Sequence, residues 1–319
     1  MKSSRIEHVD PDWFGDEDTT VRVEWSGVNY KDGSALNRPL VMQRTPMVGG
    51  IDLVGTVEAS RSERFAPGSR VIATGFGLSQ SHNGGYADLA RLPADWLVPL
   101  PGSLTPRDAM GAGTAGFTAM LCVLALERAG VAPGSGPLLV TGAAGGVGSI
   151  AIMLLARLGY EVFAATGRPE ESGRLRALGA VGVVDRGVIT RREEWLGAER
   201  WAGAVDTLGG QALATVLAET KYGGAVAACG LAHGRDLPTT VAPFILRGVS
   251  LLGIDSVQAA MDVRLDAWNR LDELLDREQL RSAITQIELE DVPRISAEIL
   301  EGRLRGRTVV RLTGREQEA

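Results

Sequence analysis

Between residues 138 and 254, short apolar runs recur with helical segments between them. Six of these runs have the length and composition of buried strands, and they span residues 138–141, 162–166, 181–184, 204–207, 225–229 and 250–254. Strands that alternate with helices form a parallel sheet, because each connection returns along a covering helix. The pattern therefore predicts an α/β domain with a doubly wound, six-stranded parallel sheet.

In the region before residue 105, apolar and polar residues alternate with the period of two that is typical of strands. Val21, Val23 and Trp25 alternate with Arg22 and Glu24, which is typical of a half-buried strand. Turns rich in glycine and proline separate further strand-like runs, at 51–57, 70–74 and 86–90. Short strands with such turns favour a small antiparallel barrel or sandwich over more parallel units.

After residue 255 the alternation of strands and helices stops. Leu265, Trp268, Leu271 and Leu275 are expected to share the apolar face of one helix, and 306–312 has the pattern of a final strand. Since the parallel sheet is already complete, we expect this tail to return to the first domain. The domain assignment is therefore 1–112 and 256–319 for a catalytic domain, with 113–255 inserted as a nucleotide-binding domain.

A glycine-rich turn follows the first strand of the inserted domain. Ala143, Gly145 and Gly148 have the spacing of the dinucleotide fingerprint, with alanine in the first glycine position. Gly145 lets the backbone approach a pyrophosphate, and Gly148 lets the following helix pack closely on the strand. A helix that begins near Gly146 would direct free N–H groups at the phosphates. A glycine-rich turn without a ligand is the alternative.

The next strand ends where the ribose-binding residue is expected, about 20 residues past the fingerprint. An NAD enzyme usually has a carboxylate there, whereas this chain has Thr166, Gly167 and Arg168. A guanidinium binds a 2′-phosphate that a carboxylate would repel, so the sequence predicts NADPH over NADH. The alternative is a solvated Arg168 that pairs with Glu170 or Glu171.

Composition excludes several classes of function. The net charge of −6 disfavours nucleic-acid binding. Two uncharged stretches, 109–126 and 138–156, are interrupted by glycines, so we expect no membrane association. The first 18 residues are acidic and have no apolar signal core, which predicts a cytoplasmic protein.

Metal chemistry is restricted by the scarcity of ligands. The two cysteines, Cys122 and Cys229, cannot form a four-cysteine zinc site, and with three histidines a catalytic zinc site is not expected either. Hydride transfer without a Lewis-acid metal favours reduction of an activated C=C bond or a quinone over oxidation of an alcohol.

Several longer motifs resemble those of one protein family. They are Asn29-Tyr30-Lys31-Asp32, Gly50-Ile51-Asp52, Gly84-Gly85-Tyr86-Ala87, Gly113-Thr114-Ala115-Gly116 and the fingerprint turn. With the order of barrel, nucleotide domain and return, they look like the zinc-free medium-chain dehydrogenase/reductases, which are quinone oxidoreductase-like. Asp95-Trp96-Leu97-Val98-Pro99 and Pro243-Phe244-Ile245-Leu246 narrow the resemblance to the acrylyl-CoA reductase branch.

The resemblance implies a GroES-like antiparallel barrel joined to a Rossmann domain. It also implies NADPH-dependent reduction of acryloyl-CoA, or a similar enoyl-CoA, by a homodimer. Hydride would pass to the β-carbon and a proton to the α-carbon. An NADPH:quinone oxidoreductase and a non-catalytic NADPH-binding sensor are the alternatives.

Cofactor contacts follow from the same resemblance. They are expected at Tyr30, Gly145, Gly146, Val147, Gly148, Thr166, Gly167, Arg168, Arg186, Leu231, Ile245 and Ser256. Arg186 would add charge beside the adenosine phosphate. Leu231 and Ile245, in loops around the last two strands, would bracket the nicotinamide unless they belong to the core. Ser256 would bind the carboxamide or ribose unless it is a turn residue.

Tyr30 and Asn29 are the expected catalytic residues. The Tyr30 phenol would orient the nicotinamide ring or donate a hydrogen bond or proton to the developing enolate. The alternative is a tyrosine that packs at a strand end. Asn29 would orient Tyr30 or the substrate, or else satisfy a turn. The loop 75–83, which is expected to face the substrate, departs from the family pattern because it lacks the usual tryptophans and acidic residue.

Overall fold

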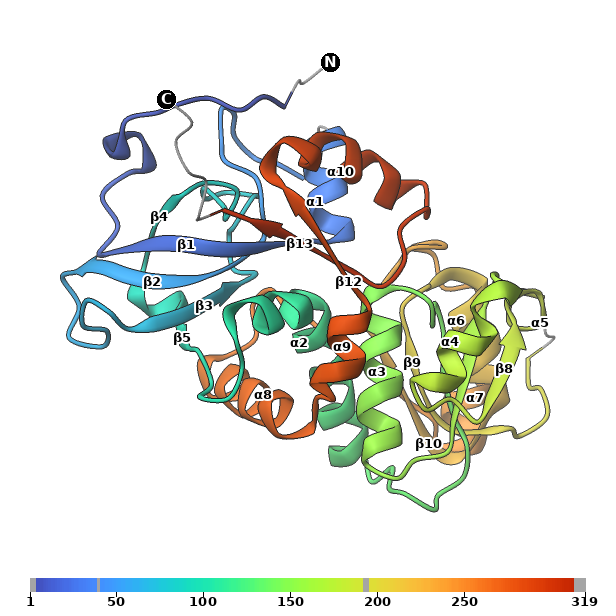
Figure 1. Cartoon of the computed structure of the whole chain (residues 1–319). Coiled ribbons are helices and arrows are strands. Elements are labelled where there is room, and N and C mark those ends of the chain that lie inside the picture. Colours follow the sequence, from blue (N-terminus) through green and yellow to red (C-terminus); the bar gives the residue numbers. More distant parts are fainter. Residues whose placement is uncertain (1–3, 39–40, 192–194, 313–319) are drawn as a thin grey trace. The chain divides into compact units, whose positions relative to one another are not determined.

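The computed structural model describes residues 4–38, 41–191 and 195–312. The chain forms two units (Figure 1). Unit 1 contains Met1–Thr114, Ser256–Asp272 and Arg277–Ala319, and unit 2 contains Ala115–Asp255 and Glu273–Asp276. The extreme ends of the predicted first domain, 1–3 and 313–319, lie outside the described residues.

The sheet of unit 2 confirms the predicted doubly wound topology. Its six strands follow the order β11-β10-β9-β6-β7-β8, and every neighbouring pair is parallel. The strands are β6 (Leu138–Val140), β7 (Val162–Thr166), β8 (Gly182–Asp185), β9 (Trp201–Asp206), β10 (Thr220–Ala228) and β11 (Ser250–Gly253). The order reverses beside β6, which places the fingerprint turn at the topological switch point, where open α/β sheets bind ligands.

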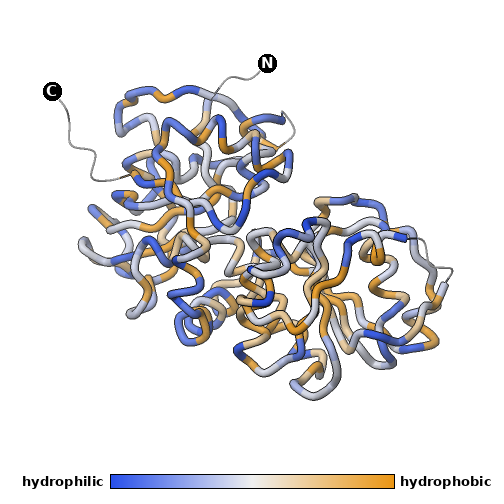
Figure 2. The backbone as a smooth tube through the Cα atoms, turned by 45° about the vertical axis from the view of Figure 1, so that its right-hand side comes forward, coloured by the Kyte–Doolittle hydropathy of each residue, from blue (hydrophilic) through white to orange (hydrophobic). Residues whose placement is uncertain are grey.

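Helices cover this sheet because its strands are apolar on both faces. In Figure 2, orange stretches of the tube mark such hydrophobic parts of the chain. Leu139, Ala204 and Val226 pack against Leu213 and Val216 of α6. The helices of unit 2 are α3 (Gly146–Arg157), α4 (Ser172–Ala177), α5 (Arg186–Thr190), α6 (Gly210–Glu219) and α7 (Ala242–Arg247), with a 3₁₀ turn η3 (Pro169–Glu171). The side chains on both faces of each central strand are therefore buried.

Unit 1 is built on a seven-stranded sheet in the order β12-β13-β1-β2-β3-β5, with β4 paired to β1. The strands are β1 (Thr19–Val28), β2 (Asp52–Ser60), β3 (Arg70–Thr74), β4 (Leu89–Leu92), β5 (Val98–Pro99), β12 (Ile284–Glu288) and β13 (Arg307–Arg311). All pairs are antiparallel except β12 with β13. The sequence did not predict β12, because Ile287 is the one buried residue of this strand and no alternation is visible.

The C-terminal part of the chain joins the first part through β13 and α10. Gly27 of β1 lies opposite Val309 of β13. A Cβ atom on Gly33 would lie 2.7 Å from the carbonyl oxygen of Ser296, so glycine is required where α1 crosses α10. The helices of unit 1 include α1 (Tyr30–Asn37), α8 (Met261–Leu274), α9 (Arg277–Ser282) and α10 (Val292–Leu300), with 3₁₀ turns η1 (Pro11–Phe14), η2 (Ala94–Trp96) and η4 (Leu289–Asp291).

The predicted apolar face of the tail helix is partly wrong. Trp268, Leu271 and Leu275 are buried as expected, but Leu265 is 36% exposed. The neighbouring Arg264 takes the inward position instead and is fully buried. The buried face of this helix includes Arg264 because its guanidinium donates hydrogen bonds to backbone carbonyls.

The long apolar helix α2 (Pro106–Arg128) joins the two units in sequence. It kinks at Gly113, where φ is 52° and ψ is −153°. By length and composition it could cross a membrane, yet 89% of its apolar stretch is buried inside the fold. A mostly buried helix of this kind is typical of a protein core.

Candidate cofactor and substrate sites

The fingerprint turn joins β6 to α3 in unit 2. Gly145 is the N-cap of α3, and its N–H donates to the Gly142 carbonyl at 2.9 Å. A Cβ atom on Gly148 would lie 2.6 Å from the Gly142 oxygen and 2.8 Å from Ala143 Cα, so only glycine fits there. Gly146, Val147 and Gly148 form the first turn of α3, whose N–H groups have no partner within the helix and can bind phosphate.

Two of the predicted arginines lie at the carboxyl ends of β7 and β8. The Thr166 hydroxyl, at the end of β7, accepts a hydrogen bond from the Arg168 backbone N–H at 3.1 Å. Arg186 begins α5 directly after β8. A Cβ atom on Gly167 would lie 2.8 Å from the Arg186 guanidinium carbon, so this guanidinium lies against the Gly167 backbone. The arrangement gathers positive charge beside the turn after β7.

Arg174 is a further member of this cluster that the sequence did not reveal. Its Nε donates to Glu171 at 2.6 Å, and its Nη2 donates to the Ala144 carbonyl of the fingerprint turn at 3.1 Å. Its Nη1 is buried without a hydrogen-bond partner in the structure. A buried, unpartnered guanidinium nitrogen beside a glycine cradle fits a phosphate-bearing dinucleotide. Its contact with Ala144 crosses 30 positions in the sequence, which no local pattern indicates.

Leu231 and Ile245 are exposed to solvent rather than packed in a core. Their exposed fractions are 65% and 73%, which rules out the core-packing alternative. Leu231 follows β10, but Ile245 lies within α7 and not in the loop that was predicted. Ser256 belongs to the part of the chain assigned to unit 1, and its carbonyl accepts from Arg264 at 3.1 Å.

Tyr30 begins helix α1 and is 41% exposed, so the alternative of a strand-end tyrosine packed on the barrel is wrong. Asn29 is the buried N-cap of this helix. The Asn29 backbone N–H donates to Asp32 at 2.9 Å, and its side-chain amide donates to Asp52 at 2.8 Å. These bonds fix the N-terminal turn of α1 and therefore the backbone of Tyr30.

A buried cluster of charged groups lies behind Asn29. Asp32 also accepts from the Ile51 N–H at 2.8 Å, and Asp52 accepts from both the N–H and the hydroxyl of Thr114. Arg307 donates to the Asn29 side-chain oxygen at 3.1 Å and is buried. Sequence positions near 30, 52, 114 and 307 thus meet in one network.

Burial and the neighbouring Asp52 raise the pKa of Asp32 from 3.8 to about 7, against the opposing effect of its N–H donors. Burial lowers the pKa of Arg307 below its ordinary value, although Asp52 and Asp32 oppose this. Asp32 is buried beside a second carboxyl group, so it is protonated more easily than a free aspartate. The network is consequently sensitive to pH in the neutral range.

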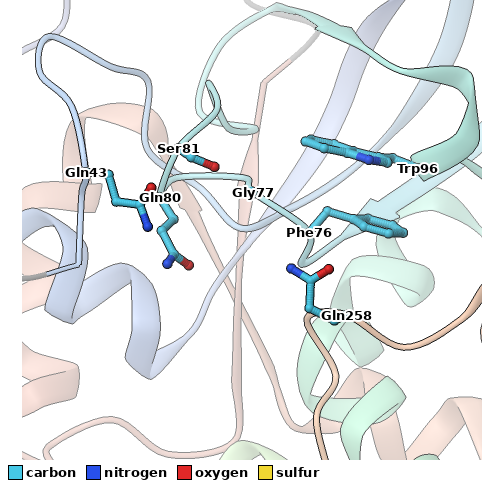
Figure 3. Close-up of a pocket in the computed structure, with 7 residues that line it drawn as sticks. All are labelled: Gln43, Phe76, Gly77, Gln80, Ser81, Trp96 and Gln258. Atoms are coloured by element: carbon cyan, nitrogen blue, oxygen red, sulfur yellow. The ribbon is translucent and has the colours of Figure 1, made fainter.

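A pocket of about 280 Å³ opens in unit 1 beside the loop 75–83. Figure 3 shows Gln43 and Gln80 on one side of it, with Phe76 and Trp96 stacked on the other and Gln258 beneath Phe76. The Gln43 backbone N–H donates to the Gln80 carbonyl at 2.7 Å, which confirms that these two residues are neighbours. The pocket therefore combines carboxamides with aromatic edges.

Within residues 4–38, 41–191 and 195–312, no three His, Cys, Asp or Glu side chains come together as a metal-binding group. Cys122 and Cys229 are free thiols.

Comparison with known proteins gives matches for both units. The family model described as alcohol dehydrogenase GroES-like domain matches residues 15–102, and the one described as zinc-binding dehydrogenase matches residues 146–274. Acrylyl-CoA reductase AcuI of Ruegeria pomeroyi is 52% identical over 295 residues, which cover 92% of this chain and 89% of that protein.

Two solved structures share the whole fold. The YhdH oxidoreductase of Salmonella enterica, in complex with NADP, has a TM-score of 0.94 and 47% identity over 96% of this chain and 95% of that one. Bacillus subtilis YhfP, solved with NAD bound, has a TM-score of 0.94 and 44% identity over 97% of this chain and 95% of that one. The chain thus belongs to the zinc-free, quinone oxidoreductase-like medium-chain dehydrogenase/reductases.

Proposed function

We propose that this protein reduces the C=C bond of acryloyl-CoA, or a similar enoyl-CoA, to the saturated acyl-CoA with NADPH. The observation that carries the proposal is the 52% identity to acrylyl-CoA reductase AcuI across nine-tenths of the chain. The fingerprint turn and its arginines supply a matching cofactor site. The reaction adds one hydride and one proton, so the substrate gains two electrons and two hydrogens in total.

NADPH supplies the hydride when it is bound. Gly145 to Gly148 would hold its pyrophosphate, and Arg168, Arg174 and Arg186 would hold its 2′-phosphate. Arg168 favours this phosphate, because it stands where an NAD enzyme has an acidic residue. The NADP-bound relative supports the assignment of NADPH as the cofactor. Another relative was solved with NAD bound, so the affinities for NADPH and NADH should be compared directly.

Tyr30 is proposed to stabilise the reacting thioester. Hydride addition at the β-carbon moves negative charge onto the thioester oxygen, and a phenol hydrogen bond to that oxygen strengthens as the charge develops. The exposed Tyr30 ring is held at the start of α1 by the bonds of Asn29 to Asp32 and Asp52. Asn29 thus acts as a positioning residue, and a proton then completes the α-carbon.

NADPH oxidation tests the proposal, with acryloyl-CoA and a benzoquinone assayed in parallel. Faster, saturable turnover of the thioester supports it. The quinone alternative has support from YhfP, which carries a quinone oxidoreductase name and is 46% identical to this chain. Fast quinone turnover with a silent thioester would establish that alternative. NADPH binding without turnover of either acceptor would establish the sensor.

We further propose that the protein is a homodimer and works in the cytoplasm. Strand β11 supports the first point, since it lies at the edge of its sheet with Ser250 and Leu251 exposed and its outer hydrogen-bonding groups open to a second copy. The two free thiols and the soluble substrate and cofactor support the second. Light scattering tests the mass in solution, and cell fractionation tests the location.

A further inference from the structure

The loop that borders the pocket holds two residues in an unfavourable backbone conformation. Phe76 and Ser79 have φ angles of 49° and 59°, in the left-handed region that side chains other than glycine rarely adopt. Such residues are energetically unfavourable, and they persist where their surroundings fix them. The Phe76 N–H donates to the Val257 carbonyl at 2.9 Å, which is one such restraint. Strained residues of this kind concentrate at binding sites.

The Phe76 ring is fixed from both of its faces. Trp96 stacks on it with centroids 5.2 Å apart and an angle of 5° between the planes. The Arg264 guanidinium lies over the ring at 4.0 Å, and it must occupy the opposite face because Trp96 fills the first. Arg264 is fully buried and donates to the carbonyls of Thr74 and Val257. The ring can therefore present only its edge to the pocket.

The polar lining of the pocket consists of neutral groups. Gln43, Gln80 and Gln258 contribute carboxamides and Ser81 contributes a hydroxyl, and none of the described residues that line the cavity is charged. Gln80 has a defined orientation because its Oε1 accepts from Lys31 Nζ at 2.9 Å, and a lysine ammonium can only donate. Its amide nitrogen is left to donate elsewhere. A carboxamide carries both donor and acceptor atoms.

We propose that this pocket binds the pantetheine arm of the acyl-CoA substrate. The inference rests on the proposed function and names the part of the substrate that the pocket takes. Pantetheine carries two secondary amides, and each has one N–H and one carbonyl that a glutamine carboxamide can match. Its geminal methyl groups suit the edges of Phe76 and Trp96. The lining of the pocket thus combines neutral carboxamides with the edges of aromatic rings, which matches the amides and methyl groups of pantetheine.

The other parts of CoA fit the pocket less well. Its diphosphate and 3′-phosphate would meet no charged group among the described lining residues, and the two cations beside the pocket already donate elsewhere, Lys31 to the Gln80 side chain and Arg44 to the Ser81 carbonyl. Its adenine would find no free face of Phe76 on which to stack. The Lys31–Gln80 bond also joins the pocket to the start of α1, where Tyr30 directly precedes Lys31. The amide arm is the part of CoA nearest the thioester, which the proposed function assigns to Tyr30.

Three acryloyl thioesters test the proposal in steady-state assays with saturating NADPH: acryloyl-CoA, acryloyl-pantetheine and S-ethyl thioacrylate, which has no amide. The test variants are the double change Gln43→Ala with Gln80→Ala, and the single change Gln80→Glu. The glutamate keeps an acceptor for Lys31, so that variant retains the local fold while it loses the amide donor. Gln286→Ala, on the exposed surface of β12, is the control.

We expect the double variant to raise KM about tenfold for acryloyl-CoA and for acryloyl-pantetheine, with kcat within about twofold. Gln80→Glu should also raise KM for both of these substrates. The KM for S-ethyl thioacrylate should stay the same in all variants, and the control variant should keep the wild-type KM values. Three results would overturn the inference alone. The first is an equal KM in wild type and variants, and the second is an equal rise in KM for S-ethyl thioacrylate. The third is a rise in KM for acryloyl-CoA without one for acryloyl-pantetheine. A wild-type enzyme that turns over no acryloyl-CoA would overturn the proposed function and this inference with it.

Discussion

Protonation of Asp32 should make the stability of unit 1 depend on pH in the neutral range. Asp32 is fully buried beside Asp52, and its pKa in the folded protein is about 7 against an ordinary value of 3.8. Folding therefore favours the protonated carboxyl. The stability from this group is fully present below the unfolded pKa and is lost as the pH rises through the folded one.

The size of the effect follows from the two pKa values. They differ by about three units, and each unit is worth about 1.4 kcal/mol, so the whole contribution is about 4 kcal/mol. More than half of this free energy is lost within a pH range in which unfolding is easily measured. Between about pH 5 and about pH 8, Asp32 alone should lower the free energy of unfolding by about 2.5 kcal/mol.

Urea unfolding at several pH values measures this free energy, with tryptophan fluorescence as the signal. Trp96 and Trp268 both report on unit 1. Other titrating groups contribute as well, so the quantity to compare is the difference between wild type and Asp32→Asn, which cannot titrate. Asp266→Asn, on the exposed face of α8, is the matched control and should keep the wild-type pH dependence.

The expected result is a loss of stability toward high pH that is about 2.5 kcal/mol larger in the wild type than in Asp32→Asn. Parallel curves for the two proteins would show that Asp32 does not titrate in this range. They would mean that the N–H groups of Asn29 and Ile51 keep Asp32 ionised in spite of its burial.

Three further changes test the cofactor and catalytic sites. Tyr30→Phe should lower kcat about 10- to 100-fold with an unchanged Kd for NADPH, because the phenol acts in the transition state; unchanged turnover would remove Tyr30 from catalysis. Arg168→Ala should raise KM about tenfold for NADPH and leave KM for NADH unaltered, and an equal rise for both would argue against a 2′-phosphate contact. Gly148→Val should abolish NADPH binding in a fluorescence titration, since its Cβ would lie 2.6 Å from the Gly142 oxygen; retained affinity would contradict this geometry.

The parallel sheet and its fingerprint turn could be predicted because their determinants are local. Each strand is an apolar run, and Gly145 and Gly148 lie within a few residues of the turn that they shape. Helix α1 could not be predicted in the same way. Its segment is poor in apolar residues and contains Gly33, and it is stabilised by the Asn29–Asp32 cap and by its contact with α10.

The candidate sites illustrate the same limit. Arg174 contacts Ala144, and Arg264 contacts Phe76, across intervals that no periodicity reveals. The inward position of Arg264 also displaced Leu265, which the helical pattern had assigned to the core. Residue type indicated a cofactor site, but which guanidinium groups reach it depends on tertiary contacts.

Transfer of deuterium from NADPH labelled at the nicotinamide C4 to acryloyl-CoA tests the proposed reaction itself. Mass spectrometry of the product should find propionyl-CoA with one deuterium at the β-carbon from one of the two C4 epimers, and solvent hydrogen at the α-carbon. Oxidation of NADPH with no labelled propionyl-CoA from either epimer would show that the protein does not transfer hydride to acryloyl-CoA.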